Sequence, residues 1–272
     1  MRAARYAVAL VALAAAPASA MHPGARPGEA FTFKFSLGPI EGGRARMSIG
    51  RPIAQKGRHV LAVHGEAETT AFVKMLAKVN DDYQLVVDTG NLLPVSVAEV
   101  ERGMRERRIS VSHVDGRTAD VDFWSPGKQH KGRHVLSRVA RDPLSNFFAL
   151  RALPLSDGQH IDLDVLDGQA LWRVALDVHR GDHVRLEHDA EARAAIRIDG
   201  VARRIEDNGR PRAGIGSRAM TIWLSDDDNR VLLRMEAETD LGRCALELTS
   251  YVPPRARAAD EHAPDLPGIE TR

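Results

Sequence analysis

Short runs of alternating apolar and polar residues recur along most of the chain, and this alternation limits the fold more than any other feature. In the first run, Phe31, Phe33, Phe35 and Leu37 alternate with polar residues. Successive side chains of a β-strand point to opposite faces, so such a strand buries one face and exposes the other. The same pattern recurs at 44–49, 161–165, 172–178, 196–199 and 231–238.

Strands with one apolar and one polar face favour an antiparallel sheet that curls around a single interior. They disfavour a parallel α/β sheet, whose strands are buried on both faces. We therefore predict an all-β protein with one or two short helices. Two arrangements fit the pattern: an antiparallel open barrel, or two curved half-barrel sheets, in each case around a central plug helix.

Two segments break the alternation and predict helices. Residues 72–79 place Phe72, Met75, Leu76 and Val79 at the spacing of one helix face. The second helix, at 142–153, has stronger boundaries. Asp142 is a favoured N-cap, Pro143 suits the first helical position, and Pro154 ends the run.

The 142–153 helix is apolar around most of its circumference, which is typical of a buried helix. Phe147, Phe148 and Leu150 are therefore predicted to fill, or to line, the interior of the curled sheet. Arg151 ends this helix, where an unpaired guanidinium would be costly. Two roles fit Arg151: a structural clamp on a carboxylate or carbonyl groups, or a contact to a ligand headgroup at a cavity mouth.

The domain organisation follows from the ends of the chain. Residues 1–20 combine arginines, an apolar run and the sequence Ala-Ser-Ala, which predicts a secretory signal peptide. Residues 28–252 are expected to form a single all-β domain. The similar hairpin patterns at 83–100 and 220–238 suggest a pseudo-repeat with halves at about 28–125 and 158–252. The mixed composition of 253–272 predicts a disordered tail.

Charge and cysteine content exclude several classes of protein. Loss of residues 1–20 removes two arginines and leaves a nearly neutral chain, which argues against a nucleic-acid binder. Cys244 is the single cysteine, so no disulfide can form within the chain. No segment after the signal is long and apolar enough to predict a membrane span. We expect a periplasmic monomer.

The motifs that could carry chemistry are weak. His130 and His134 have an H-x-x-x-H spacing, but they lie in a glycine- and lysine-rich stretch without the helix of a zinc protease. Residues 225–229 read as a polar hairpin turn rather than a calcium loop, and the Arg-Gly-Asp at 180–182 reads as a turn. Ser145 suits helix capping. We predict no catalytic residues, no metal site and no cofactor.

Three stretches in this order resemble the exported bacterial proteins grouped as domain of unknown function 3108, over roughly residues 28–252. They are the opening Gly28-Glu29 strand, a central helix and a late strand pair. The matching positions in the helix and the pair are Asp142, Ser145, Leu150, Arg151, Trp223, Leu224, Ser225 and Asp226. The chain departs from the pattern where it has Leu232-Leu233 for proline-valine, and Phe147 or Phe148 for tyrosine. The resemblance implies a β-rich exported protein and no reaction.

Two functions from different classes fit these features. The first is a non-enzymatic protein that binds or carries an apolar small molecule, such as a lipid or an acyl chain, in cell-envelope maintenance. The second is an interaction or scaffold module of an envelope complex.

Overall fold

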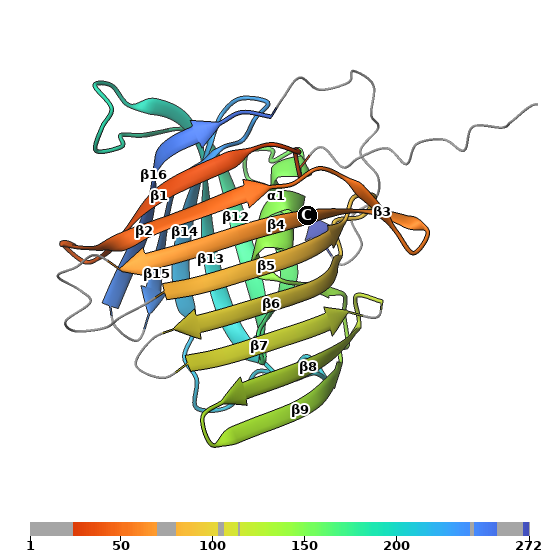
Figure 1. Ribbon diagram of the computed structural model, residues 1–272. Helices are drawn as coiled ribbons and strands as arrows, with labels where there is room; N and C mark the ends of the chain where they lie inside the picture. The colour runs from red at the N-terminus through yellow and green to blue at the C-terminus, as the bar shows by residue number, and fades with distance from the viewer. Residues whose placement is uncertain are drawn as a thin grey trace, which may run out of the picture.

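The computed structural model describes residues 24–69, 80–102, 106–113, 115–239, 242–254 and 269–271. They form one helix and seventeen strands that belong to one sheet (Figure 1). The all-β class is thus confirmed. The strands of the first half are β1 (Ala30–Leu37), β2 (Ile40–Ile49), β3 (Ile53–Gln55), β4 (Arg58–Thr69), β5 (Asn80–Asp88), β6 (Pro94–Arg102), β7 (Glu106–His113), β8 (Thr118–Ser125) and β9 (Lys128–Val135).

The rest of the chain contributes the helix and the second half of the sheet. The elements are β10 (Ala140–Arg141), α1 (Pro143–Ala152), β11 (His160–Asp167), β12 (Ala170–Val184), β13 (Arg193–Ile205), β14 (Arg218–Ser225), β15 (Leu232–Thr239), β16 (Gly242–Val252) and β17 (Ile269–Thr271). The predicted strand at 44–49 is the second part of β2, and the run at 231–238 is β15.

The strands follow one continuous antiparallel path. From one edge the order is β9, β8, β7, β6, β5, β4, β2, β1, β16, β15, β14, β13, β12 and β11. β1 pairs with both β2 and β16, so the first strand joins the two halves of the sheet. Phe31 and Phe33 of β1 are buried at this junction. Because one strand connects both halves, the sheet is single.

The sheet curls into two facing walls but does not close. Strands β2 and β4–β9 form the front wall in Figure 1, and β11–β16 form the wall behind it. Among the described residues, no pairing joins β9 to β11. The free edge of β11 carries two short strands, β10 in parallel and β17 in antiparallel pairing. The protein is therefore an open antiparallel barrel.

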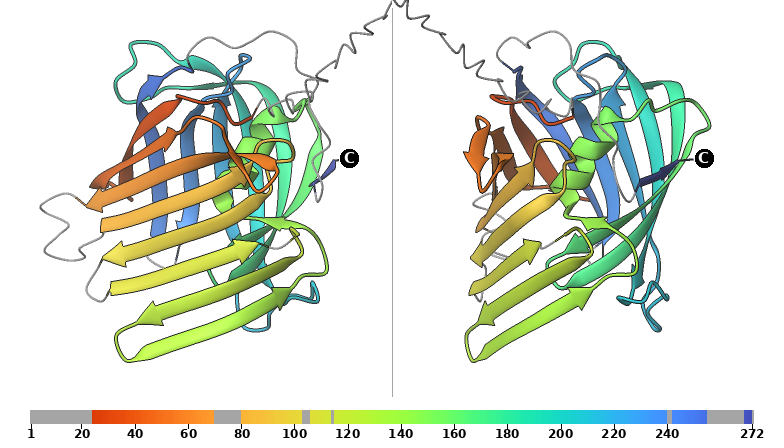
Figure 2. Two further views of the ribbon diagram at one scale, coloured as in Figure 1. Left: turned by 45° about the vertical axis from the view of Figure 1, so that its right-hand side comes forward. Right: turned by 90° about the vertical axis from the view of Figure 1, so that its right-hand side faces the viewer.

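Helix α1 lies between the two walls (Figure 2). Its N-cap is Asp142, whose carboxylate accepts hydrogen bonds from the backbone N–H of Leu144 at 2.9 Å and of Ser145 at 3.2 Å. Leu153 is the C-cap, directly before Pro154. The predicted helix boundaries are confirmed. Phe148 and Ala149 are fully buried, which agrees with the apolar circumference of the helix.

Some expectations have a different outcome. The Arg-Gly-Asp sequence does not form a turn between two strands, because β12 continues through it to Val184. The register with β13 shifts between His179 and Asp182, and Gly181 adopts φ 74° there, so the glycine allows a bulge within one long strand.

Other predictions remain open. The helix expected at 72–79 lies outside the described residues. In the tail expected to be disordered, 269–271 pairs with β11 as β17, whereas 255–268 is outside the described residues. The hairpins β5–β6 and β14–β15 correspond to the two halves of the suggested repeat, and the repeat itself stays a prediction.

We expect Phe148→Ala to lower the free energy of unfolding by about 3–5 kcal/mol, because it removes a fully buried ring between the walls. Urea denaturation would measure this change. Ile53→Ala is the matched control, since Ile53 is 55% exposed and its truncation should change stability by less than about 0.5 kcal/mol. Equal effects of the two substitutions would contradict the buried position of Phe148.

Candidate functional site

A cavity of about 590 Å³ lies between the two walls beside α1. Its lining comes from β1, β2, β4, β5, α1 and β11–β16, and most of it is apolar. The large side chains on the wall opposite β2 include Leu163, Val174, Met220, Ile222 and Met235. The inner faces that the alternation predicts thus enclose a space that their own side chains leave partly empty.

Five residues of α1 line this cavity: Pro143, Leu144, Asn146, Phe147 and Leu150. Phe147 and Phe148 are in contact, with ring centroids 5.6 Å apart, but Phe148 is not part of the lining and belongs to the buried core. Of the residues that the sequence suggested, Phe147 and Leu150 therefore line the cavity, whereas Phe148 packs behind them.

Arg151 is engaged in a buried ion pair rather than in the cavity lining. Its two terminal nitrogens donate to the carboxylate of Glu29 at 2.8 and 2.7 Å, and the side chains are 1% and 0% exposed. Further acceptors are the carbonyl groups of Gly24 and Asn229, and the Tyr251 hydroxyl also donates to Glu29 at 2.7 Å. Of the two predicted roles, these contacts support the structural clamp.

The first turns of α1 connect the helix to both walls. The Tyr83 hydroxyl of β5 donates to Asp142 at 3.0 Å. On the other side, the side-chain amide of Asn146 donates to the backbone carbonyl of Asp164 in β11 at 3.3 Å. The helix therefore bridges the two facing walls, and the sequence contained no signal for these partners.

Asp142 is a buried carboxyl group with a structural role. Burial raises its pKa, and hydrogen bonds from Ser145, Tyr83 and Leu144 act in the opposite direction. Burial and the charge of Asp142 in turn raise the pKa of Tyr83. The Ser145 hydroxyl donates to Asp142 and lies in the first turn of α1, which agrees with capping.

A second group of carboxylates lies where the two walls approach each other: Asp81 of β5, Glu99 and Glu101 of β6, and Asp167 of β11. Burial and then the charges of Asp167, Glu101 and Asp81 raise the pKa of Glu99 to about 7. Burial likewise raises the pKa of Asp81 and, reinforced by nearby carboxylates, that of Asp167. Asp81 and Asp167 line the cavity.

The strand alternation contained a signal for these carboxylates. Glu99 and Glu101 continue the face that Val97 buries, and Asp167 continues the face of Leu163. A charged residue in the inner register of a strand marks a place where the interior is polar. The sequence could not tell that these positions from β6 and β11 face one another.

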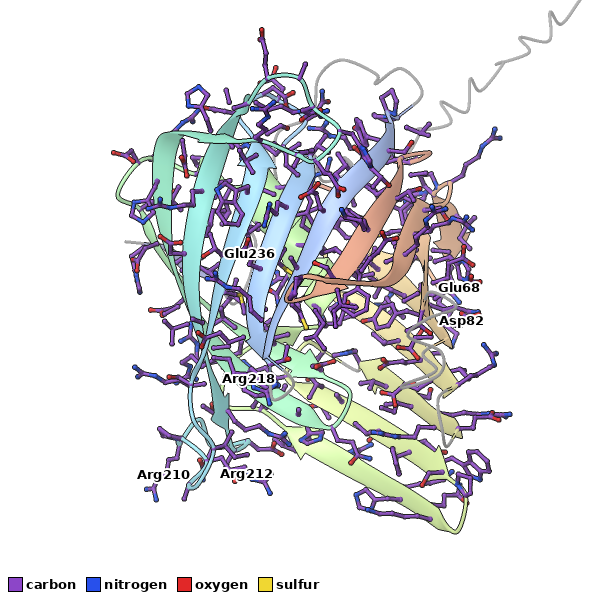
Figure 3. The ribbon with its side chains drawn as sticks, turned by 90° about the vertical axis from the view of Figure 1, so that its left-hand side faces the viewer. Glu68, Asp82, Arg210, Arg212, Arg218 and Glu236 are labelled. Carbon is purple, nitrogen blue, oxygen red and sulfur yellow. The ribbon has the colours of Figure 1, made fainter. Side chains whose placement is uncertain are left out.

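Two arginines flank an aromatic ring on the opposite wall. The guanidinium carbons of Arg204 and Arg218 lie 5.7 and 5.0 Å from the Trp172 ring, which is within the range of cation–π attraction. Trp172 and Arg218 line the cavity, and Figure 3 labels Arg218 at the start of β14. The cavity lining is therefore mostly apolar, with charged residues near the ends of β5, β11, β14 and β15.

No group of three or more histidine, cysteine or acidic side chains suits a metal ion in the part of the chain that the structure describes. His134 instead contacts Asp207 at 2.8 Å. Asp227 accepts hydrogen bonds from the backbone N–H of Asn229 and Arg230, so 225–229 is the hairpin turn that the sequence predicted. Within the same residues, no helix has the length and apolar character needed to cross a membrane.

The fold and site define an open antiparallel β-barrel whose internal helix forms one side of an apolar cavity. The chain belongs to the DUF3108 family, described as a protein of unknown function, whose model matches residues 31–249. The resemblance seen in the sequence is thus confirmed. The family description names no reaction. No curated protein matches the chain.

Several solved structures share parts of this architecture at low sequence identity. A β-barrel-like protein of the DUF1849 group from Brucella abortus is 11% identical, with 84% of this chain and 98% of that chain covered and a TM-score of 0.48. An exported protein with a YmcC-like fold from Bacteroides fragilis is 6% identical, with coverage of 86% and 100% and a TM-score of 0.38. A lipoprotein from Parabacteroides distasonis is 6% identical, with coverage of 86% and 99% and a TM-score of 0.35.

The raised pKa of Glu99 predicts a pH-dependent effect on stability. Its pKa is about 7 in the folded protein against an ordinary 4.5, so the stability associated with the protonated group is lost as the pH rises through about 7. We expect Glu99→Gln to raise the urea midpoint at about pH 8, and the difference from wild type to shrink as the pH falls and to vanish below the ordinary pKa of 4.5.

The control is Glu191→Gln, which neutralises an exposed glutamate in the connection between β12 and β13. It should leave the urea midpoint unchanged at both pH values. A Glu99→Gln protein that is less stable than wild type at the higher pH would contradict an unfavourable environment for the ionised group.

Proposed function

We propose that this protein is an exported, non-enzymatic carrier that encloses an apolar ligand, such as a lipid or one acyl chain, in the cell envelope. The observation that carries the proposal is the apolar cavity of about 590 Å³ beside α1. Ligand-binding pockets commonly have volumes of about 300–1,000 Å³, mostly apolar walls and a few polar groups. The cavity has all three properties.

The arrangement of the lining supports a ligand with an apolar body. Leu144, Phe147 and Leu150 of α1 face the apolar strands of the second half of the sheet. Six charged residues belong to the lining: Arg46 and Glu66 lie within β2 and β4, and Asp81, Asp167, Arg218 and Glu238 lie near the ends of β5, β11, β14 and β15. A chain in the apolar part would thus remove its methylene groups from water and leave a polar end near charged side chains.

The proposed location depends on the N-terminal sequence. Arg2 and Arg5, the following apolar run and Ala18-Ser19-Ala20 are in the order of a secretory signal peptide. We place the processed protein in the periplasm, where a carrier would meet lipids from both membranes.

A series of saturated fatty acids from about eight to fourteen carbons tests the proposal through its dependence on chain length. Each methylene that enters the cavity should lower the Kd by about fourfold, because burial of one methylene contributes about 0.8 kcal/mol. Displacement of a fluorescent apolar probe would measure the Kd. No binding of any member, or a Kd that is independent of chain length, would contradict an acyl-binding cavity.

Filling the cavity should weaken this binding without unfolding the protein. Ala237 of β15 lines the cavity, and Ala237→Trp should raise the Kd for the longest fatty acid by at least about tenfold. Ala54→Trp introduces the same ring at an exposed position of β3 and serves as the control. The thermal midpoints of both variants should be reported with the Kd values. A folded Ala237→Trp protein with wild-type affinity would place the ligand elsewhere.

The alternative of an interaction or scaffold module has one feature in its favour. Among the described strands, β9 pairs only with β8, so one backbone edge is open to strand addition. However, β9 contains Lys128, Lys131 and Arg133, and basic side chains on an edge strand commonly prevent such pairing. The carrier is therefore the better-supported function.

A further inference from the structure

The connection between β13 and β14 and the strand ends that flank it form a basic part of the surface. From 203 to 218 the chain has five arginines against two acidic residues, an excess of three positive charges. Every residue from Arg210 to Ser217 is exposed. Figure 3 shows Arg210 and Arg212 close together in this connection. We call residues 203–218 the basic loop.

The acidic residues of the basic loop compensate little of this charge at its exposed end. Asp207 is turned towards β9, where it contacts His134 at 2.8 Å, and its backbone carbonyl accepts from the N–H of Ser137. Glu206 lies 3.6 Å from Arg212, but both side chains are about half exposed, at 52% and 49%. With five arginines against two acidic residues, the basic loop therefore keeps an excess of positive charge.

The basic loop also exposes an aliphatic side chain. Ile215 is 40% exposed and lies between Gly214 and Gly216. Gly214 has φ 77°, a conformation that most other residues rarely adopt. Ile215 follows Arg210 and Arg212 by a few residues. This exposed part of the loop therefore presents an apolar side chain close to two cationic ones.

We propose that the basic loop docks on an anionic lipid surface, with Arg210 and Arg212 at the phosphates and Ile215 in the interfacial region. Anionic bilayers attract clustered arginines, and interfacial segments add apolar side chains that enter the headgroup region. A stable protein interface needs about 20–30 residues on each side, which is more than this loop offers. A bilayer surface imposes no such requirement.

The position of the basic loop connects docking with the cavity. The loop ends at the start of β14, where Arg218 and Met220 line the cavity. Docking through the loop would therefore bring this part of the cavity to the bilayer. The inference goes beyond the proposed ligand binding, because a surface contact of this kind does not require an occupied cavity.

Flotation with lipid vesicles tests the proposal on the processed full-length protein. Vesicles with about 30 mol % phosphatidylglycerol in phosphatidylcholine should bind the protein, and pure phosphatidylcholine vesicles should bind it much more weakly. Arg210→Ser with Arg212→Ser should reduce the partition coefficient by about 25-fold, from about fivefold for each arginine. Ile215→Ser should reduce it severalfold. High salt should weaken binding of the wild type.

A matched control removes the same charge elsewhere. Arg51 and Arg58 are exposed beside β3, which Figure 1 shows on the right-hand side, away from β14. Their replacement by serine should leave partition within about twofold. An equal loss in this control, or no preference of the wild type for anionic vesicles, would overturn the proposal. The arginine variants should bind fatty acids with the same Kd as the wild-type protein. Loss of vesicle binding can therefore be distinguished from loss of ligand binding.

Discussion

The structure depends on the position of α1 between the two walls of an open sheet. Among the described strands no pairing joins β9 to β11, and the helix connects the two walls at β5 and β11 through the Tyr83–Asp142 and Asn146–Asp164 hydrogen bonds. A single sheet of this length cannot fill its interior with its own inward side chains. The helix supplies Phe148 and Ala149 to the core on one side and Leu144, Phe147 and Leu150 to the cavity on the other.

The buried ion pair between Arg151 and Glu29 fixes the far end of the helix. It connects the last turn of α1 with the residue directly before β1, and Tyr251 of β16 adds a third group. Removal of one partner from such a pair leaves an uncompensated buried charge, so the position of the helix is specified as well as stabilised. The Arg151–Glu29 pair thus links β1, which joins the two halves of the sheet, to α1, which lies between the two walls.

The polar part of the interior has a different origin. Glu99, Asp81 and Asp167 are held near one another by strands of both halves, and their raised pKa values result from burial and mutual repulsion. The Arg204–Trp172–Arg218 group lies on the second wall, on β12–β14. A mostly apolar cavity with charged residues near its strand ends is the physical basis of the proposed carrier, and the adjacent basic loop gives this part of the protein a surface that suits a bilayer.

The sequence by itself determined the strands with clear alternation, the ends of α1, the all-β class and the family, because each depends on local periodicity or on short motifs; it did not predict β3 or β7–β9. It also indicated that Phe147, Phe148 and Leu150 are interior residues. The tertiary structure decided that Phe148 belongs to the core while Phe147 faces a cavity, that Glu29 partners Arg151, and that the charge of Asp167 acts on Glu99. The alternation within a strand indicates which of its faces is buried, but it does not indicate which other strand packs against that face. Contacts between residues as distant as Glu29 and Arg151 follow only from the path of the whole sheet.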